Sequence, residues 1–296
     1  MNVSYFSIGG LSCKVTSKLN FDIPKHIEAF TIIGTPDIID INICIDEYTS
    51  NTMTDHPVIK FGKLIYKNEN EMCVYKDDSH YLFIMPYEDE CYVRVIIVDT
   101  LINTVYMYYD NTNYLLKSST HFLDSSAFML SYILLLIHNY NGFLLHSGAV
   151  RYGEGGFLYY GISGAGKSTL SEIFSQRYDV FTDETVIIRC IKGSYFMYGS
   201  HWKGSGHEIY MNSNCMIKNT VSIYHSEVNI LTKLDDKMAL DLLLQQSFPM
   251  FWDHKLIVLL ISKLFDFVKQ QSNYSLGFYP NDDVIGFLQD RRIINQ

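Results

Sequence analysis

Residues 161–169 combine the residue types that bind phosphate in many nucleotide-binding proteins. They read GISGAGKST, and their first eight residues match the P-loop (Walker A) pattern G-x-x-x-x-G-K-[ST] in full. Glycines let the backbone turn successive N–H groups inward, and the helix that follows adds the positive end of its dipole. We expect Lys167 to reach the β- and γ-phosphates and Ser168 to ligate Mg²⁺. The alternative is a glycine-rich turn that matches by chance.

The ligands implied by this loop are ATP and Mg²⁺, although a preference for ATP over GTP is an assumption. We expect the metal to be held by Ser168 and Asp183. The residues expected to bind the nucleotide are Gly161, Ser163, Gly164, Ala165, Gly166, Lys167, Ser168 and Thr169.

Two adjacent carboxylates, Asp183 and Glu184, follow an apolar stretch 16 residues after Lys167. A strand, loop, helix and strand path would bring them back beside the loop. One carboxylate would hold Mg²⁺, directly or through water, and the other would accept a proton from an attacking hydroxyl. Which of the two is the base stays open, and the alternative is a solvated acidic turn.

His146 lies in the apolar segment FLLHSGAV, one predicted strand before the loop. From spacing alone, a lone histidine in an apolar strand is more often a satisfied structural group than a catalytic one.

Several motifs in order resemble the HPr kinase-like branch of the phosphoenolpyruvate carboxykinase superfamily. They are LLHSGAV, GFLYYGISGAGKSTL, VFTDETVII, YGSHWKG and VSIYHSEVNILTKL. The resemblance covers residues 125–290 and implies a carboxykinase-type P-loop core. It also implies that His146 lies beside the metal and the γ-phosphate, and that Asp183 and Glu184 take the places of an Asp-Asp pair.

The chain departs from this family pattern at two positions. The second acid is Glu184 rather than aspartate, and His201 stands where the pattern has proline. The Arg-Gly signature expected further along in bifunctional HPr kinase/phosphorylases is missing, which speaks against dephosphorylation and against HPr as the partner.

Composition bounds the possible functions. The chain has 296 residues, 48% of them hydrophobic, and a net charge of −9, which is typical of a globular protein and speaks against a general nucleic-acid binder. Its six cysteines form no C-x-x-C pair, so zinc ribbons and thioredoxin-type redox sites are not expected. No signal peptide is recognised at the start, so reduced thiols in the cytoplasm are expected. The apolar runs are shorter than the roughly 20 residues that a bilayer requires, so no membrane association is expected. An oligomer is compatible with the sequence.

The elements around these residues change in character along the chain. Short runs rich in Ile, Val, Tyr and Phe, separated by turn residues, predict a small, mainly antiparallel β domain over residues 1–124. Residues 125–296 alternate strand and helix patterns and predict a mixed α/β, P-loop nucleotide-binding domain. Its catalytic residues are expected to be Asp183, Glu184, His146 and Lys167.

Together these observations predict an ATP- and Mg²⁺-dependent kinase, a transferase that passes the γ-phosphoryl group to a hydroxyl. The family resemblance suggests serine in a peptide, protein or small molecule as the acceptor, with peptide natural-product maturation as one context. The alternative is a non-catalytic ATP-binding sensor or scaffold protein.

Overall fold

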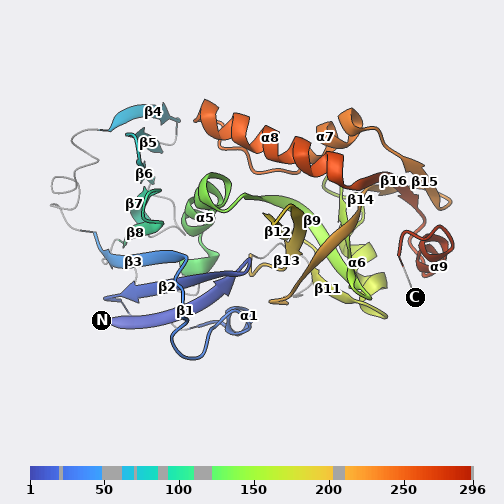
Figure 1. The fold of residues 1–296 in the computed structure, drawn as a ribbon, viewed down its shortest axis with the longest axis horizontal. Coiled ribbons are helices and arrows are strands. Elements are labelled where there is room, and N and C mark those ends of the chain that lie inside the picture. Colours follow the sequence, from blue (N-terminus) through green and yellow to red (C-terminus); the bar gives the residue numbers. More distant parts are fainter. Residues whose placement is uncertain are drawn as a thin grey trace. The chain divides into compact units, whose positions relative to one another are not determined.

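The computed structural model describes residues 1–19, 23–48, 62–69, 72–85, 93–109, 122–202 and 211–294. They form two compact units, residues 1–139 with 250–254 and residues 140–249 with 255–296 (Figure 1). Residues 125–139 therefore group with the first unit, whereas the sequence pattern placed the start of the second domain at residue 125. The domain boundaries 1–124 and 125–296 stay a prediction.

The first unit is built on an eight-stranded sheet in the order β1-β2-β3-β8-β7-β6-β5-β4. Strand β3 runs parallel to both of its neighbours, and the other pairs are antiparallel. In β2, buried and partly buried residues alternate, as expected when one face of a strand packs on a core. The strands are β1 (Asn2–Ile8), β2 (Leu11–Ser17), β3 (Ile41–Glu47), β4 (Lys63–Lys67), β5 (Cys73–Lys76), β6 (His80–Ile84), β7 (Val93–Asp99) and β8 (Thr104–Tyr109).

The longest helix described in the first unit is largely apolar. Helix α5 (Ser126–Asn139) is buried on most of its surface. Ser125 caps it, because its Oγ accepts a hydrogen bond of 3.1 Å from the backbone N–H of Phe128. The others are the short helix α1 (Lys25–Glu28) and the 3₁₀ turn η1 (Phe122–Asp124).

The second unit contains a mixed sheet in the order β10-β9-β12-β13-β14-β16-β15, with β11 paired to β9. Strands β10, β14 and β16 run parallel to one another. Their carboxyl ends therefore meet at one edge, where ligands bind in many open α/β sheets. The strands are β9 (Gly142–Tyr152), β10 (Gly155–Tyr160), β11 (Asp179–Thr182), β12 (Thr185–Ile191), β13 (Ser194–Tyr198), β14 (Asn214–His225), β15 (Ile230–Lys233) and β16 (Ser272–Phe278).

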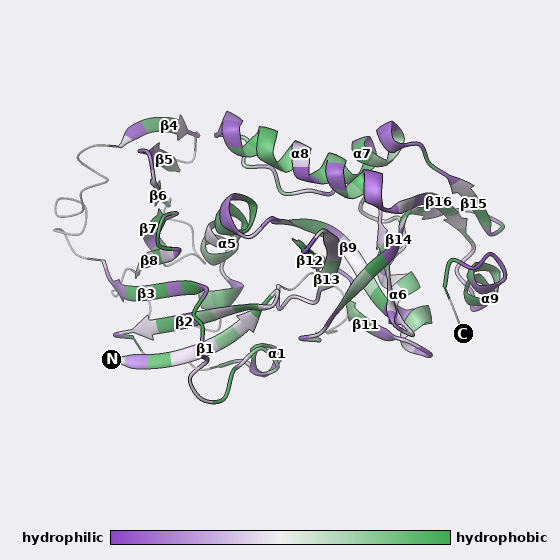
Figure 2. Cartoon of the chain, viewed as in Figure 1, coloured by the Kyte–Doolittle hydropathy of each residue, from purple (hydrophilic) through white to green (hydrophobic). Residues whose placement is uncertain are grey.

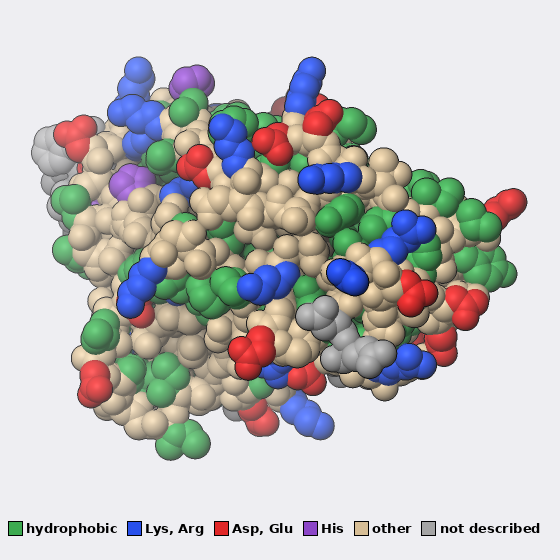
Figure 3. All heavy atoms as spheres, turned by 45° about the vertical axis from the view of Figure 1, so that its right-hand side comes forward, with side chains coloured by type: hydrophobic (Ala, Val, Ile, Leu, Met, Phe, Trp, Pro, Cys, Tyr) green, Lys and Arg blue, Asp and Glu red, His purple; other side chains and the backbone are tan. Residues whose placement is uncertain are grey.

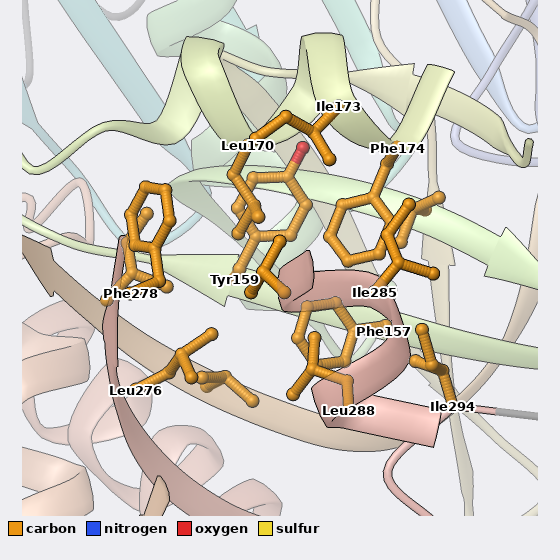
Figure 4. Packing of buried hydrophobic residues seen from close by; sticks show 14 of the residues in the cluster. Phe157, Tyr159, Leu170, Ile173, Phe174, Leu276, Phe278, Ile285, Leu288 and Ile294 are labelled. Atoms are coloured by element: carbon orange, nitrogen blue, oxygen red, sulfur yellow. The ribbon is translucent and has the colours of Figure 1, made fainter. Parts of the chain in front are cut away.

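A core of buried aromatic and aliphatic side chains holds the helices of this unit to the sheet. Phe157 and Tyr159 of β10 pack with Phe174 of α6 and Leu288 of α9 (Figure 4). Helix α8 is amphipathic, and Figure 2 shows apolar and polar segments alternating along it. The helices are α6 (Lys167–Ser175), α7 (Asp236–Leu244), α8 (His254–Gln270) and α9 (Asp283–Asp290).

The predicted fold class, mixed α/β, is confirmed: the described residues contain two mixed sheets and six α-helices. The finer assignment to a carboxykinase or HPr-kinase core stays a prediction. No helix in the described part of the chain is long and apolar enough to cross a bilayer. Acidic and basic side chains are interspersed on the face shown in Figure 3 rather than separated by sign.

Candidate active site

Strand register brings the predicted site residues to one level of the second sheet. Strand β10 ends at Tyr160, which lies opposite Ser147 of β9. The next residue along β9 in that direction is His146, which pairs on its other side with Thr185, the first residue of β12. The phosphate loop begins where β10 ends, and the acidic pair directly precedes β12. The loop, the histidine and the acids are therefore neighbours because of β-pairing.

The phosphate loop connects β10 to α6, as the sequence predicted, and two of its glycines are required by its shape. Gly164 and Gly166 have φ of 79° and 96°, in the left-handed region that favours glycine. A Cβ on Gly161 would lie 2.8 Å from the carbonyl oxygen of Ile223, so that glycine permits close backbone contact. The fold thus needs glycine at all three glycine positions of the loop.

Lys167 is the first residue of α6, and its side chain turns back into the loop. Its Nζ donates a 2.9 Å hydrogen bond to the carbonyl oxygen of Gly161, and only 7% of the residue is exposed. Burial lowers the pKa of Lys167, and the carboxylates of Glu184 and Asp183 oppose that shift. The ammonium is thus held close to two negative charges at the mouth of the loop.

Asp183 and Glu184 form the turn between β11 and β12, and their environments differ. Asp183 is 4% exposed, and its Oδ2 is a buried acceptor with no hydrogen-bond partner among the described residues. The side chain of Glu184 is 34% exposed. An unsatisfied buried carboxylate oxygen is costly to keep unless a cation or donor completes it. Asp183 is therefore suited to a bound ion, and Glu184 to an incoming group.

His146 is held by its backbone and faces the acidic pair. Its N–H donates to the carbonyl oxygen of Gln246 at 2.8 Å, and its Nδ1 lies 3.4 Å from Oε1 of Glu184. Burial lowers the pKa of His146, and the positive charge of Lys167 adds to this, against the Glu184 and Asp183 carboxylates. The side chain of His146 is 30% exposed, and its imidazole lies near the charges of Lys167, Asp183 and Glu184.

These residues fit a nucleotide phosphate and its metal. Gly164 and Gly166 have left-handed backbone angles, which residues of anion nests also adopt, and Asp183 offers a carboxylate oxygen that no described donor satisfies. No group of three or more His, Cys, Asp or Glu side chains is placed to hold a metal within the described ranges. Mg²⁺ is usually held by one or two protein groups together with substrate phosphates. Ser168 and Asp183 would supply those groups.

Comparison with solved structures finds distant structural similarity. No family model matches the chain, and no curated protein matches its sequence. The structure is similar to that of the HPr(Ser) kinase/phosphatase from Coxiella burnetii, with 13% sequence identity and a TM-score of 0.26. The match covers 42% of this chain and 95% of the other. This is a distant similarity of fold to a P-loop kinase, and no functional property is transferred from it.

The predicted site residues stand in two groups. In the first group, the charges of Asp183 and Glu184 act on both Lys167 and His146, and the charge of Lys167 lowers the pKa of His146. Ser163 and Gly164 lie on the exposed side of the loop, and Ser168 and Thr169 are half-buried in the first turn of α6. Trp202, in the family-like motif YGSHWKG, is 2% exposed and packs beside His201. Lys203 lies outside the described residues.

Three residues of the site were not anticipated from the sequence. His225 and Phe278 end β14 and β16 and contact the loop, and Gln246 binds the backbone of His146. His225 lies in VSIYHSEVNILTKL, one of the family-like motifs, so that motif was a signal available in the sequence. Phe278 gave no such signal, because β16 was not predicted.

Proposed function

We propose that this protein is a kinase that transfers the γ-phosphoryl group of ATP to a hydroxyl. The observation that supports this most directly is the convergence of Lys167, Asp183, Glu184 and His146 on a loop that has the P-loop sequence pattern and two left-handed glycines. Such transfer needs few covalent steps by the protein, because positioning and charge neutralisation supply most of the catalysis.

The loop and Lys167 bind the donor. Backbone N–H groups of the loop and the N-terminus of α6 face the phosphates, and Lys167 neutralises the oxygens between the β- and γ-phosphates. Its present hydrogen bond to Gly161 keeps the ammonium in the loop, so little reorganisation is needed to reach a phosphate.

Ser168 and Asp183 would hold Mg²⁺. The ion would supply positive charge that draws electrons from the transferred phosphoryl group. Asp183 suits this role because its Oδ2 is buried and no described residue donates to it. The hydroxyl of Ser168 lies one residue after Lys167, where the P-loop pattern places a metal ligand.

Glu184 is the better candidate for accepting the proton of the attacking hydroxyl. Its side chain is far more exposed than Asp183, so an acceptor can reach it. Its carboxylate lies beside Nδ1 of His146, whose ring would orient it. The acceptor is proposed to be serine or another hydroxyl in a peptide, a protein or a small molecule.

The test is transfer of label from γ-labelled ATP, with Mg²⁺, to free serine or a library of Ser/Thr peptides. We expect Lys167→Ala to abolish turnover. Asp183→Asn and Glu184→Gln should each lower transfer at least about a hundredfold, which is the smallest effect usually seen when a general base is removed. Asp183→Asn should still bind ATP, since the loop is intact. Glu154→Gln is the matched control, because Glu154 lies in the exposed turn at the other end of β10.

The outcomes separate the possible readings. Transfer by the wild-type protein that survives in Asp183→Asn would contradict the assignment of the acidic pair. Tight ATP binding with no transfer to any acceptor would favour a nucleotide-binding sensor or scaffold protein.

A further inference from the structure

A residue of β14, which is not one of the two elements that the phosphate loop connects, contacts the backbone of that loop. His225 is the last residue of β14, and its Nε2 lies 2.9 Å from the carbonyl oxygen of Gly164. A carbonyl oxygen can only accept, so the imidazole must donate through a protonated Nε2. This contact joins residues 61 positions apart in the chain.

The position of His225 follows from the parallel strands. Strands β10, β14 and β16 end at the same edge of the sheet, and His225 pairs in register with Phe278 at the end of β16. The two rings stack with centroids 5.8 Å apart and an angle of 29°. A Cβ on Gly166 would lie 2.7 Å from Phe278 and 3.1 Å from His225, so the stacked pair packs against the loop.

The peptide unit after Gly164 is bound at both of its polar ends. His225 donates to its carbonyl oxygen, and its N–H, from Ala165, donates to the carbonyl oxygen of Ile162 at 3.0 Å. The C=O and N–H of a trans peptide point in opposite directions in one plane. Two bonds on opposite sides therefore fix the orientation of that plane, next to glycines that have left-handed backbone angles.

We propose that His225 is a positioning residue that locks the phosphate loop in its anion-binding conformation. The inference rests on the proposed function, since it concerns the nucleotide site of that kinase. Glycine at positions 164 and 166 leaves the loop many alternative backbone states. Fixing one peptide plane raises the fraction of molecules that are ready to bind, and apparent affinity rises in proportion to that fraction. The effect belongs to binding of the phosphates rather than to the chemical step.

The test compares two substitutions that separate the ring from its donor. His225→Phe keeps a ring to stack on Phe278 but removes the N–H. His225→Gln keeps an amide N–H of similar reach and removes the ring. Affinities for MgATP and for inorganic tripolyphosphate are measured by calorimetry on the folded full-length protein, because tripolyphosphate isolates the loop from any contact with the base.

We expect His225→Phe to weaken both ligands about threefold to tenfold, the range that one net hydrogen bond supplies. His225→Gln should restore affinity to within about twofold of the wild type. In His225→Phe, KM for ATP should rise while kcat stays the same. Nitrogen-15 NMR of labelled histidine should show His225 as the Nε2–H tautomer in the wild-type protein, a readout that needs no variant.

Three results would overturn the inference. Unchanged affinity in His225→Phe would remove the bond from the binding mechanism, and equal loss in both variants would assign the effect to ring packing. An Nδ1–H tautomer would contradict the bond directly. Failure of the wild-type protein to bind either ligand is a different result, because it contradicts the proposed nucleotide site as well.

Discussion

At the scale of single residues, the phosphate loop depends on glycines for two different physical reasons. Gly164 has φ of 79° and open space where a Cβ would stand, whereas Gly166 has φ of 96° and packs against two rings. An alanine at either position is strained by the backbone conformation, but only at Gly166 does it also meet other atoms. Substitutions at these two glycines can therefore separate the cost of backbone strain from the cost of crowded packing within one loop.

Gly166→Ala is predicted to destabilise the protein more than Gly164→Ala. The backbone strain of a non-glycine residue costs about 1 kcal/mol or more at either position. Contact with Phe278 and His225 adds about 1–3 kcal/mol at Gly166 alone. Urea unfolding of the two variants measures the difference. Equal stability losses would mean that the two rings move aside freely.

At the scale of elements, the pairing of β9 with β10 decides where the site forms. Gly148 of β9 lies opposite Tyr159 of β10, and the tyrosine ring covers the glycine. The hydroxyl of that tyrosine is hydrogen-bonded to Ser171 of α6, and burial raises the pKa of Tyr159, so it stays protonated. One buried side chain thus joins β9, β10 and α6 below the phosphate loop.

Gly148→Ala is predicted to be strongly destabilising, because its Cβ would lie 2.2 Å from Cζ of the Tyr159 ring. Tyr159 is fully buried and tied to Ser171, so it cannot move without breaking the core. We expect a loss of about 1–3 kcal/mol, typical of overpacking, measured by thermal or urea unfolding.

The control for that prediction is the same substitution where space is open. Gly286 lies in the interior of helix α9 and is exposed, and a Cβ added there would have no atom within 4 Å beyond its own helix backbone and chain neighbours. Gly286→Ala should stabilise the protein by about 0.5–1 kcal/mol, because glycine is unfavourable inside helices. Destabilisation by both substitutions to a similar extent would contradict the packing argument for Gly148.

At the scale of the whole molecule, neither of the two units is a single continuous segment of the chain. Residues 250–254 belong to the first unit although the segments on both sides of them belong to the second. Asp253, 6% exposed, accepts a 2.6 Å hydrogen bond from the Tyr81 hydroxyl and forms an ion pair with Lys76. Burial and the Asp253 carboxylate raise the pKa of Tyr81, which keeps it a donor. Trp252 packs on Phe83 beside this pair.

Asp253→Asn is predicted to destabilise the first unit by about 1–3 kcal/mol, because it weakens hydrogen bonds to a buried charge. The chain has two tryptophans, Trp252 in the first unit and Trp202 in the second, so each unit has its own fluorescent reporter. Urea unfolding is followed by tryptophan fluorescence in two backgrounds. Trp202→Phe leaves Trp252 as the reporter of the first unit, and Trp252→Phe leaves Trp202 as the reporter of the second. The loss of stability should appear in the Trp252 transition.

The matched control is Asp241→Asn, because Asp241 is exposed on α7 in the second unit. It should leave both fluorescence transitions within about 0.5 kcal/mol of their starting points, as surface substitutions usually do. A shift in the Trp202 transition alone after Asp253→Asn would contradict the placement of residues 250–254.

The sequence by itself determined the local features of this protein. The spacing of glycines, Lys167 and Ser168 predicted a phosphate loop between a strand and a helix, and both elements are present. Apolar runs predicted β9 and β10 as strands, and both are buried along nearly their whole length. These features depend on residues that are close together in the chain, so they can be predicted from one sequence.

Only the tertiary structure decided which distant residues share the site and how each is buried. Strand β16 was not predicted, yet its register with β14 places Phe278 and His225 against the loop. The sequence left open whether Asp183 or Glu184 is the base, and the fold buries Asp183 and leaves Glu184 partly exposed. Strand register and burial arise from pairings between segments far apart, and no local pattern of residues specifies them.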